Sequence, residues 1–346
     1  MLEYTPVEIG IIFAAAPLVR FIIPFAFLKG LTLNRTTFNL ALGLMALSAL
    51  GFWPFLEHFN ALLIVNICFG IGMSLVLPYI EVIALSEIGK ERYGRVRLFG
   101  SIGFILVALL LVKTLTSPYS AIAYLIVMAL VTIFFGYIIA KNDHHKITQH
   151  PQSTPLQALN ILPHYTLWLG LVFMQMSFGA FYNFFTIYET AHGISLDMTI
   201  YLWSFGVIIE VLMFYFQGPL LRRNLLLLLQ IATFATIIRW LIVYLYPENL
   251  ALLFIAQSIH ALSFALFHSA AIALLYSLYE NKKLAQQFFS GITYGLGGFV
   301  GALVSGYVYE YWPQQLFLSA AFFASIAFVM FLKSRHILKL ENKLRT

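Results

Sequence analysis

Three side chains that can hold or transfer a proton lie inside long apolar stretches of this sequence: Glu210, Arg239 and His260. An ionisable side chain in apolar surroundings is costly unless it is partnered or hydrated, so each is a candidate functional residue. A carboxylate, a guanidinium and an imidazole in consecutive stretches could couple proton movement to ligand binding, because moving the arginine changes whether the carboxylate holds a proton. The alternative is a static buried ion pair beside a hydrogen-bonded core histidine.

A second set of polar side chains could contact a small organic ligand. Aromatic rings such as that of Tyr182 could stack on a flat ligand, while the amides of Gln175 and Gln257 could hydrogen-bond its polar end. His268 lies eight residues after His260, roughly 80° further round a helix. Ordinary packing is the alternative for any one aromatic residue, because Phe and Tyr are abundant throughout the chain.

Further charges lie within or at the ends of apolar stretches, at Arg20, Glu81 and Arg97. Arg20 is near the middle of its stretch, where we expect a structural charge that pairs with a neighbouring helix. The sequence has no H-E-x-x-H motif, no G-x-S-x-G motif and no Cys/His spacing typical of zinc sites. We therefore expect no metal, no cofactor and no enzymatic activity.

Membrane helices must position these residues, because most of the chain is too apolar for a soluble fold. Hydrophobic residues make up 61% of the sequence and charged residues 10%, with a mean hydropathy of +0.88. About 20 apolar residues cross a bilayer as a helix. Eleven stretches have about this length or more: 6–28, 38–56, 60–84, 98–116, 119–140, 164–188, 197–218, 224–246, 249–275, 287–309 and 313–332. We predict an all-α integral membrane protein with eleven transmembrane helices.

The basic residues indicate how these helices are oriented. Apart from Arg20, Lys113 and Arg239, every Lys and Arg lies in alternate gaps between the stretches or in the C-terminal tail. The positive-inside rule then places these gaps and the C-terminus in the cytoplasm. The net charge of +6 therefore belongs to loops at the membrane surface, which argues against nucleic-acid binding.

The longest polar gap divides the chain into two groups of helices. We expect an N-terminal bundle of five spans at 1–140, a cytoplasmic linker at 141–163, a C-terminal bundle of six spans at 164–333 and a cytoplasmic tail at 334–346. A span end, a charged loop and a Gly-rich span start at 84–103 are echoed at 275–295. The copies fall at the same place in each half only if the first half once had six spans, so we expect that the first helix of twelve is missing before Met1. Parallel six-helix repeats around a long inner linker are typical of major facilitator transporters.

Small residues predict where helices approach closely. Gly291/Gly295 and Gly297/Gly301 have G-x-x-x-G spacing, and the pairs at 100/103 and 70/72 are similar. Glycine lacks a Cβ atom, so two backbones can come close enough for van der Waals attraction to act in lipid. These surfaces could be fixed packing contacts or could slide during a conformational change.

Several motifs resemble one group of membrane proteins. The stretch 93–104, YGRVRLFGSIGF, is similar to the Y/F-G-R-x-R-x-F/W-G-x-x-G segment shared by lactose permease and the phenylpropionate permease group. Four further features resemble the phenylpropionate group in particular: 201–207 with Glu210, Arg239-Trp240, Gln257 with His260, and His268 with Ala270-Ala271. The chain therefore resembles the phenylpropionate permease, lactose permease and nucleoside–proton symporter group of the major facilitator superfamily, which implies a two-bundle helical transporter.

The resemblance implies roles for individual residues. Glu81 and Arg97 match ligand-contacting residues of lactose permease, and Arg239 and His260 match an arginine and a histidine of its ninth and tenth helices. This chain departs from that pattern at Ser263, where the family has a proton-binding glutamate one turn after the histidine. Glu210 is then the best remaining proton carrier.

From these features we expect a secondary active transporter that moves a small organic solute by alternating access. We favour proton-coupled uptake of an aromatic carboxylate, a sugar or a nucleoside-like solute across the cell inner membrane, by a monomer with its C-terminus in the cytoplasm. Its partners would be the substrate, protons and the lipid bilayer, and the proton gradient would supply the energy. The alternatives are an exporter of drugs or metabolites with the same fold, and a non-transporting membrane sensor or inactive remnant.

Overall fold

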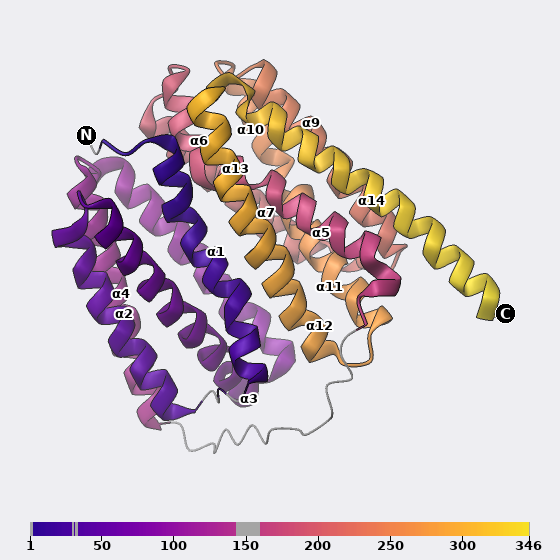
Figure 1. Ribbon diagram of the computed structural model, residues 1–346, viewed down its shortest axis with the longest axis horizontal. Helices are drawn as coiled ribbons and strands as arrows, with labels where there is room; N and C mark the ends of the chain where they lie inside the picture. Colours follow the sequence, from indigo (N-terminus) through magenta and orange to yellow (C-terminus); the bar gives the residue numbers. More distant parts are fainter. Residues whose placement is uncertain (1–2, 30, 32–33, 143–159, 346) are drawn as a thin grey trace. The chain divides into compact units, whose positions relative to one another are not determined.

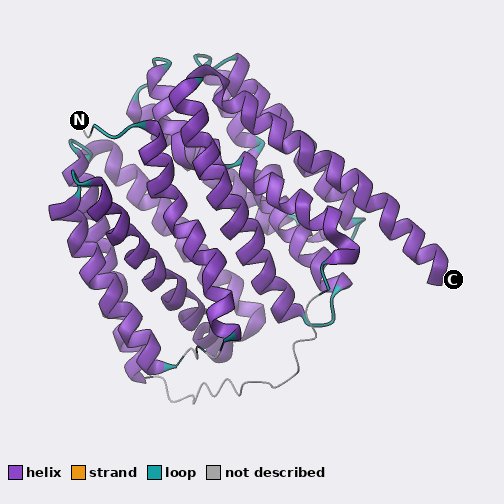
Figure 2. Ribbon diagram, viewed as in Figure 1, coloured by secondary structure: helices purple, strands orange, loops and turns teal. Residues whose placement is uncertain are grey.

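A computed structural model describes residues 3–29, 31, 34–142 and 160–345 of the chain. Within these residues the regular secondary structure consists entirely of helices, as Figure 2 shows. Ten helical segments of the described chain are long and apolar enough to cross a membrane, and Ile102–Thr114 is a shorter apolar segment. This agrees approximately with the eleven predicted spans and with an all-α membrane fold.

The chain falls into two compact units, Met1–Leu156 and Gln157–Thr346. The boundary between them lies in residues 143–159, so most of the predicted cytoplasmic linker is outside the described residues.

The described residues of the first unit form four helices, drawn in indigo to magenta in Figure 1. They are α1 (Pro6–Leu28), α2 (Arg35–Phe55), α3 (Phe59–Thr114) and α4 (Pro118–Asn142). Both α1 and α2 pack against α3, and α4 packs against α2. The core between α2 and α3 is built on Phe38 and Tyr79, whose rings stack with centroids 4.1 Å apart.

Helix α3 differs from the sequence prediction, because one continuous helix covers two predicted spans and the charged loop between them. The residues of that predicted loop include Glu87, Lys90, Glu91 and Arg95, with opposite charges three and four positions apart. Such pairs support a helix, and Glu, Lys and Arg have high helix propensity. Hydropathy shows where a chain leaves the apolar region, but it does not show where a helix ends.

The second unit begins with a 3₁₀ turn (Leu162–His164) and is drawn in magenta to yellow in Figure 1. Its helices as far as the predicted ninth span are α5 (Tyr165–Ser177), α6 (Gly179–Ala191), α7 (Leu196–Phe216), α8 (Gly218–Leu221), α9 (Leu225–Leu245) and α10 (Leu250–Ser258). The chain continues through a π-helical segment (Ala261–Leu266), α11 (Phe267–Leu278), α12 (Lys282–Phe288), a second π-helical segment (Phe289–Gly297), α13 (Gly298–Tyr311) and α14 (Leu316–Arg345).

Several predicted spans are therefore interrupted helices. The sixth span breaks at Phe178 between α5 and α6, and π-helical turns interrupt the ninth and tenth. π-Helical turns are rare and are frequent at functional sites. At the other end of this unit, α14 continues as a helix as far as Arg345, through the predicted tail.

Glycines allow α13 and the π-helical turn before it to pack against α5 and α6. A Cβ atom on Gly179 would collide with the carbonyl oxygen of Gly301, and one on Gly297 would lie 2.9 Å from the carbonyl oxygen of Val172. The predicted close approach at Gly297 and Gly301 is present in the structure. For Gly100 and Gly103, none of the described residues lies within 4 Å of a Cβ atom built there.

Candidate functional site

The centre of the candidate site is the guanidinium of Arg239 on α9, which is 0% exposed. Its central carbon lies 4.3 Å from the ring centroid of Phe181, 4.4 Å from that of Trp240 and 5.7 Å from that of Phe178. A guanidinium over an aromatic face is attracted by the negative charge of the π system, most strongly where water is excluded. Three rings thus cover one buried cation.

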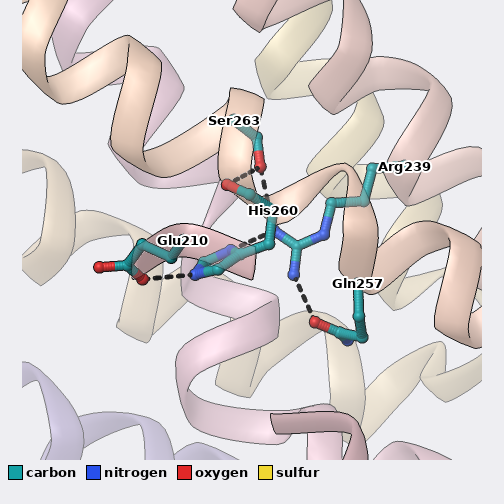
Figure 3. A network of polar contacts seen from close by, with 5 residues as sticks. All are labelled: Glu210, Arg239, Gln257, His260 and Ser263. Carbon is teal, nitrogen blue, oxygen red and sulfur yellow. Dashed lines mark hydrogen bonds and ion pairs between the residues drawn. The ribbon is translucent and has the colours of Figure 1, made fainter. Parts of the chain in front are cut away.

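The hydrogen bonds of Arg239 all end on neutral acceptors within the described part of the chain. Nη1 donates to Nδ1 of His260 over 2.9 Å and to Oγ of Ser263 over 3.2 Å, and Nη2 donates to Oε1 of Gln257 over 3.1 Å (Figure 3). Nε of Arg239 and Nε2 of Gln257 are buried donors that bond to none of the described residues. The site therefore has a positive charge and two unused hydrogen-bond donors, which suit a ligand that carries an anionic oxygen.

His260 connects this cation to a carboxylate. Its Nε2 lies 3.3 Å from Oε2 of Glu210, on the side of the ring away from Arg239 (Figure 3). A guanidinium can only donate hydrogen bonds, so Nδ1 of His260 must present its lone pair to Arg239. The ring proton is then on Nε2 and is donated to Glu210. While Arg239 keeps this contact, His260 cannot take up a second proton at Nδ1.

Local structure explains why these side chains meet. Asn224 accepts a hydrogen bond from the backbone N–H of Leu227 and so caps the start of α9, while Ser195 caps α7 through the N–H of Met198. The first π-helical segment begins directly after His260. A π-helical turn is wider than an α-helical turn, and this one starts where His260 and Ser263 both contact Arg239. Oγ of Ser263 also donates a hydrogen bond to the carbonyl oxygen of His260 over 3.3 Å.

Gly206 on α7 leaves the space that Gln257 occupies. A Cβ atom at Gly206 would lie 3.0 Å from Oε1 of Gln257 and 3.7 Å from Cδ2 of His260. Any larger residue at this position would press on the amide that accepts from Arg239. Gly206 belongs to a stretch that the sequence analysis singled out only for its resemblance.

His268 lies beside this network. Its Nδ1 is 2.6 Å from the hydroxyl of Tyr294 in the second π-helical segment. The ring of Phe264 stacks between the two imidazoles, 5.4 Å from that of His260 and 6.2 Å from that of His268. His268 therefore joins the two π-helical segments, a contact that helical spacing did not predict.

Tyr182 and Gln175 have different surroundings from each other. Tyr182 is 39% exposed and stacks against Phe178 and Trp203, at centroid distances of 5.4 and 6.4 Å. Gln175 lies where α5 meets the second π-helical segment, with its Cβ 3.1 Å from a Cβ atom built on Gly297. Tyr182 thus extends the aromatic surface beside Arg239, whereas Gln175 lies at a helix contact.

The remaining candidates belong to the first unit. Glu81 and Arg97 are positions of α3, but their side chains lie outside the described residues. Arg20 is on α1 and is exposed.

Sequence reasoning missed two contributors to the site. Ser263 was noticed only as a departure from a family pattern, yet it accepts a hydrogen bond from Arg239. Ser177, at the break between α5 and α6, accepts a 3.4 Å hydrogen bond from Nε1 of Trp240 and thereby holds one of the rings over the guanidinium. The run of aromatic residues at 178, 181, 182 and 185 was the available signal for the aromatic cover.

Comparison with known proteins gives a consistent result. The model of the MFS_1 like family matches residues 1–319. The chain is 27% identical over 310 residues to a probable 3-phenylpropionic acid transporter of Escherichia coli (strain K12), covering 84% of this chain and 78% of that protein. It is 22% identical over 356 residues to the uncharacterized transporter YwbF of Bacillus subtilis (strain 168), covering 98% and 86%.

Solved structures share the fold at low sequence identity. The nucleoside transporter NupG is similar with a TM-score of 0.76 and 17% identity, over 98% of this chain and 92% of that one. The D-xylose-proton symporter is similar with a TM-score of 0.71 and 13% identity, over 95% and 87%. At such identities the likeness concerns the fold alone.

Proposed function

Since this chain belongs to the MFS_1 like family and is therefore a major facilitator transporter of small solutes, we propose that it takes up an aromatic carboxylate together with a proton. The observation that carries the proposal is the buried guanidinium of Arg239, bonded to neutral acceptors and connected through His260 to Glu210. As a transporter it is a multi-pass membrane protein and not an enzyme. We also propose that transport is uptake coupled to protons, and that the protein lies in the inner membrane with its C-terminus in the cytoplasm.

Arg239 favours an anionic substrate, because its hydrogen-bond acceptors His260, Ser263 and Gln257 are neutral. A buried cation carries a large desolvation cost, which a carboxylate bonded to it would offset. Guanidinium–carboxylate bonds are charge-assisted and can be bidentate. Nε of Arg239 and Nε2 of Gln257 are further donors that such a group could satisfy.

An aromatic substrate is favoured by the rings beside this cation. Phe178, Tyr182 and Trp203 form a stacked series, in which Tyr182 is partly exposed. Ligand sites in proteins are largely apolar with a few placed polar groups, and a ring joined to a carboxylate matches that composition. The similar protein from Escherichia coli is named for 3-phenylpropionic acid, which has this chemistry.

The order Glu210, His260, Arg239 supports the proposal of proton coupling. When Glu210 is ionised, it attracts the His260–Arg239 pair and competes with a substrate anion for the same positive charge. When Glu210 takes up a proton, the positive charge of Arg239 is available to the substrate. Proton binding and anion binding then favour each other, as in reciprocal linkage, where coupling is typically about 1–3 kcal/mol.

Whether His260 can accept a proton would depend on its contact with Arg239. A substrate carboxylate that draws Arg239 away frees Nδ1 of His260, which can then accept a proton while Nε2 faces Glu210. The two groups of helices would alternate in opening the site to each side of the membrane. Glu81 and Arg97 are proposed to contact the substrate or to gate access from the first bundle.

Transport by purified protein in liposomes tests this proposal. With an acidic exterior, wild-type protein should accumulate labelled 3-phenylpropionate, and Glu210→Gln should lose accumulation while keeping exchange of internal for external substrate. Glu248→Gln is a suitable control, because this carboxyl group is exposed in the turn between α9 and α10. Normal accumulation by Glu210→Gln would show that Glu210 is not the proton carrier. Accumulation only in vesicles of the opposite orientation would favour export.

A further inference from the structure

A second carboxyl group of this unit, that of Glu189, is buried in a different way from Glu210. Glu189 lies in the last turn of α6, is 0% exposed, and neither of its oxygens has a hydrogen-bond partner among the described residues. Glu57 shows the ordinary arrangement, because it is exposed and accepts a 2.8 Å hydrogen bond from the hydroxyl of Tyr119. Glu189 follows directly after the predicted span 164–188 in the sequence.

An ionised carboxylate is poorly compatible with this position. Burying a charge without hydrogen bonds costs far more than burying the neutral acid. The C-terminal end of a helix also carries partial negative charge, which opposes a carboxylate in the last turn. Backbone N–H groups of the following turn are engaged by the carbonyl oxygen of Glu189, which accepts from His192 over 3.1 Å and from Ile194 over 3.0 Å. The carboxyl group receives no such donor.

Among the described residues of this unit, the titratable groups near Glu189 do not supply a compensating cation. Helices α5, α7, α13 and α14 pack against α6. The titratable side chains of this turn are Tyr188 and His192, and Tyr244 and Tyr309 lie near Tyr188. The nearest acidic positions of α7 and α13 in the sequence are Asp197 and Glu310. Within this group His192 alone can become cationic, and its Nδ1 donates to the carbonyl oxygen of Tyr188 over 2.8 Å, not to Glu189. The ends of α5 and α14 that meet α6 carry no titratable residue at 174–177 or 316–325.

We infer that Glu189 is a second proton-binding site of this protein, occupied in this conformation and emptied when water reaches the C-terminal end of α6. The ligand is a proton, and the group that binds it is a carboxylic acid held neutral by burial. This inference rests on the contacts of α6 and not on the role proposed for Glu210.

The same helix face links this site to Arg239. Phe181, Phe185 and Glu189 are spaced four residues apart, so they follow one another along one side of α6. The ring centroids of Phe181 and Phe185 are 5.1 Å apart, and the ring of Phe181 lies against the guanidinium of Arg239. The ring of Trp203 on α7 contacts both, at centroid distances of 4.1 Å from Phe181 and 5.8 Å from Phe185. Loss of the proton from Glu189, which requires hydration of this face, would therefore disturb the aromatic cover of Arg239.

Chemical labelling of the wild-type protein tests the inference directly. Dicyclohexylcarbodiimide partitions into apolar regions and reacts with protonated carboxyl groups, and peptide mapping by mass spectrometry locates the adduct. We expect severalfold more label on Glu189 than on the exposed Glu248 at neutral pH, decreasing as the pH is raised to alkaline values. Labelling of Glu189 that is independent of pH would overturn the inference.

Thermal unfolding provides a second, independent measurement in case the reagent cannot reach the side chain. Raising the pH should lower the melting temperature of the wild type more than that of Glu189→Gln, because the amide needs no proton to stay buried. Glu248→Gln should follow the wild type. Parallel curves for Glu189→Gln and the wild type would contradict the inference. Neither experiment involves transport, so a failure of the Glu210 assignment leaves both results interpretable.

Discussion

Arg239 and Glu189 are both fully buried ionisable residues of the second unit, but their surroundings differ. Arg239 donates hydrogen bonds to His260, Ser263 and Gln257 and is covered by aromatic rings. Glu189 has no hydrogen-bond partner among the described residues. A cation that cannot readily lose its proton has to be satisfied by its neighbours, whereas a carboxyl group can become neutral instead. Burial is therefore compatible with a permanent charge at one position and with a reversible proton at the other.

The largest expected effect is that of removing the permanent charge. Arg239→Met should lower uptake at sub-saturating substrate by about 10- to 100-fold or more, because it removes a charged ligand contact of about 1.5–3 kcal/mol and leaves Gln257 and His260 without their donor. Arg239→Lys should give a smaller loss, because it keeps the charge but not the planar fork. Initial uptake rates measure this effect, with exposed Arg223→Met as the control. Near-normal uptake by Arg239→Met would remove the basis of the anion site.

Interrupting the connection between the charges should have the next largest effect. His260→Gln keeps a hydrogen-bonding side chain but cannot relay a proton, so accumulation driven by a pH gradient should fall about tenfold. Substrate exchange should change much less, because Arg239 is still present. The ratio of accumulation to exchange, measured in the same liposomes, checks this prediction. An equal loss in both assays would indicate that His260 only shapes the site.

A double-mutant cycle tests whether the two buried sites act separately. If Phe181 and Phe185 transmit a change along α6, the effects of Glu189→Gln and Arg239→Lys on the free energy of substrate binding should not be additive. The double mutant should differ from the sum of the single mutants by about 0.5–1 kcal/mol. Affinity would be measured by quenching of tryptophan fluorescence with 3-phenylpropionate. Additive effects would make the Glu189 site independent of the Arg239 site, although still a proton site.

The smallest expected effect comes from a methyl group beside the network. Gly206→Ala would place a Cβ atom 3.0 Å from Oε1 of Gln257 and should weaken its hydrogen bond to Arg239, raising KM about threefold to tenfold. The matched control is Gly218→Ala at the start of α8, where nothing lies within 4 Å of the new Cβ atom. Unchanged KM in Gly206→Ala would show that Gln257 does not help to hold the guanidinium.

Sequence patterns predicted much of the helical organisation but not the helix ends. Apolar stretches located the spans, because hydropathy reflects transfer into lipid. They missed the continuity of α3 and the break at Phe178, because these depend on helix propensity and on close contacts such as that of Gly179 with Gly301. They also missed the π-helical segments, which arise from hydrogen bonding along the backbone.

For the candidate site, the sequence identified Glu210, Arg239, His260 and Gln257, and the structure brings these four side chains into one network. Their roles in transport stay predictions. Residue type indicated them, since ionisable groups in apolar stretches are rare and costly. Ser263 and the orientation of His268 toward Tyr294 could not be predicted, because each depends on which side of a π-helical turn faces a neighbour.

By itself the sequence determined that this chain is a helical membrane protein, and which of its ionisable side chains lie in apolar stretches. Those properties are local, because they depend on runs of side chains and on the cost of charge in lipid. The tertiary structure decided which partners each charge has. Arg239 of α9 meets His260 and Gln257, for which Gly206 of α7 leaves room. Glu189 meets no hydrogen-bonding partner among the described residues. The contacts between helices depend on packing over long sequence separations, which no single stretch of sequence encodes.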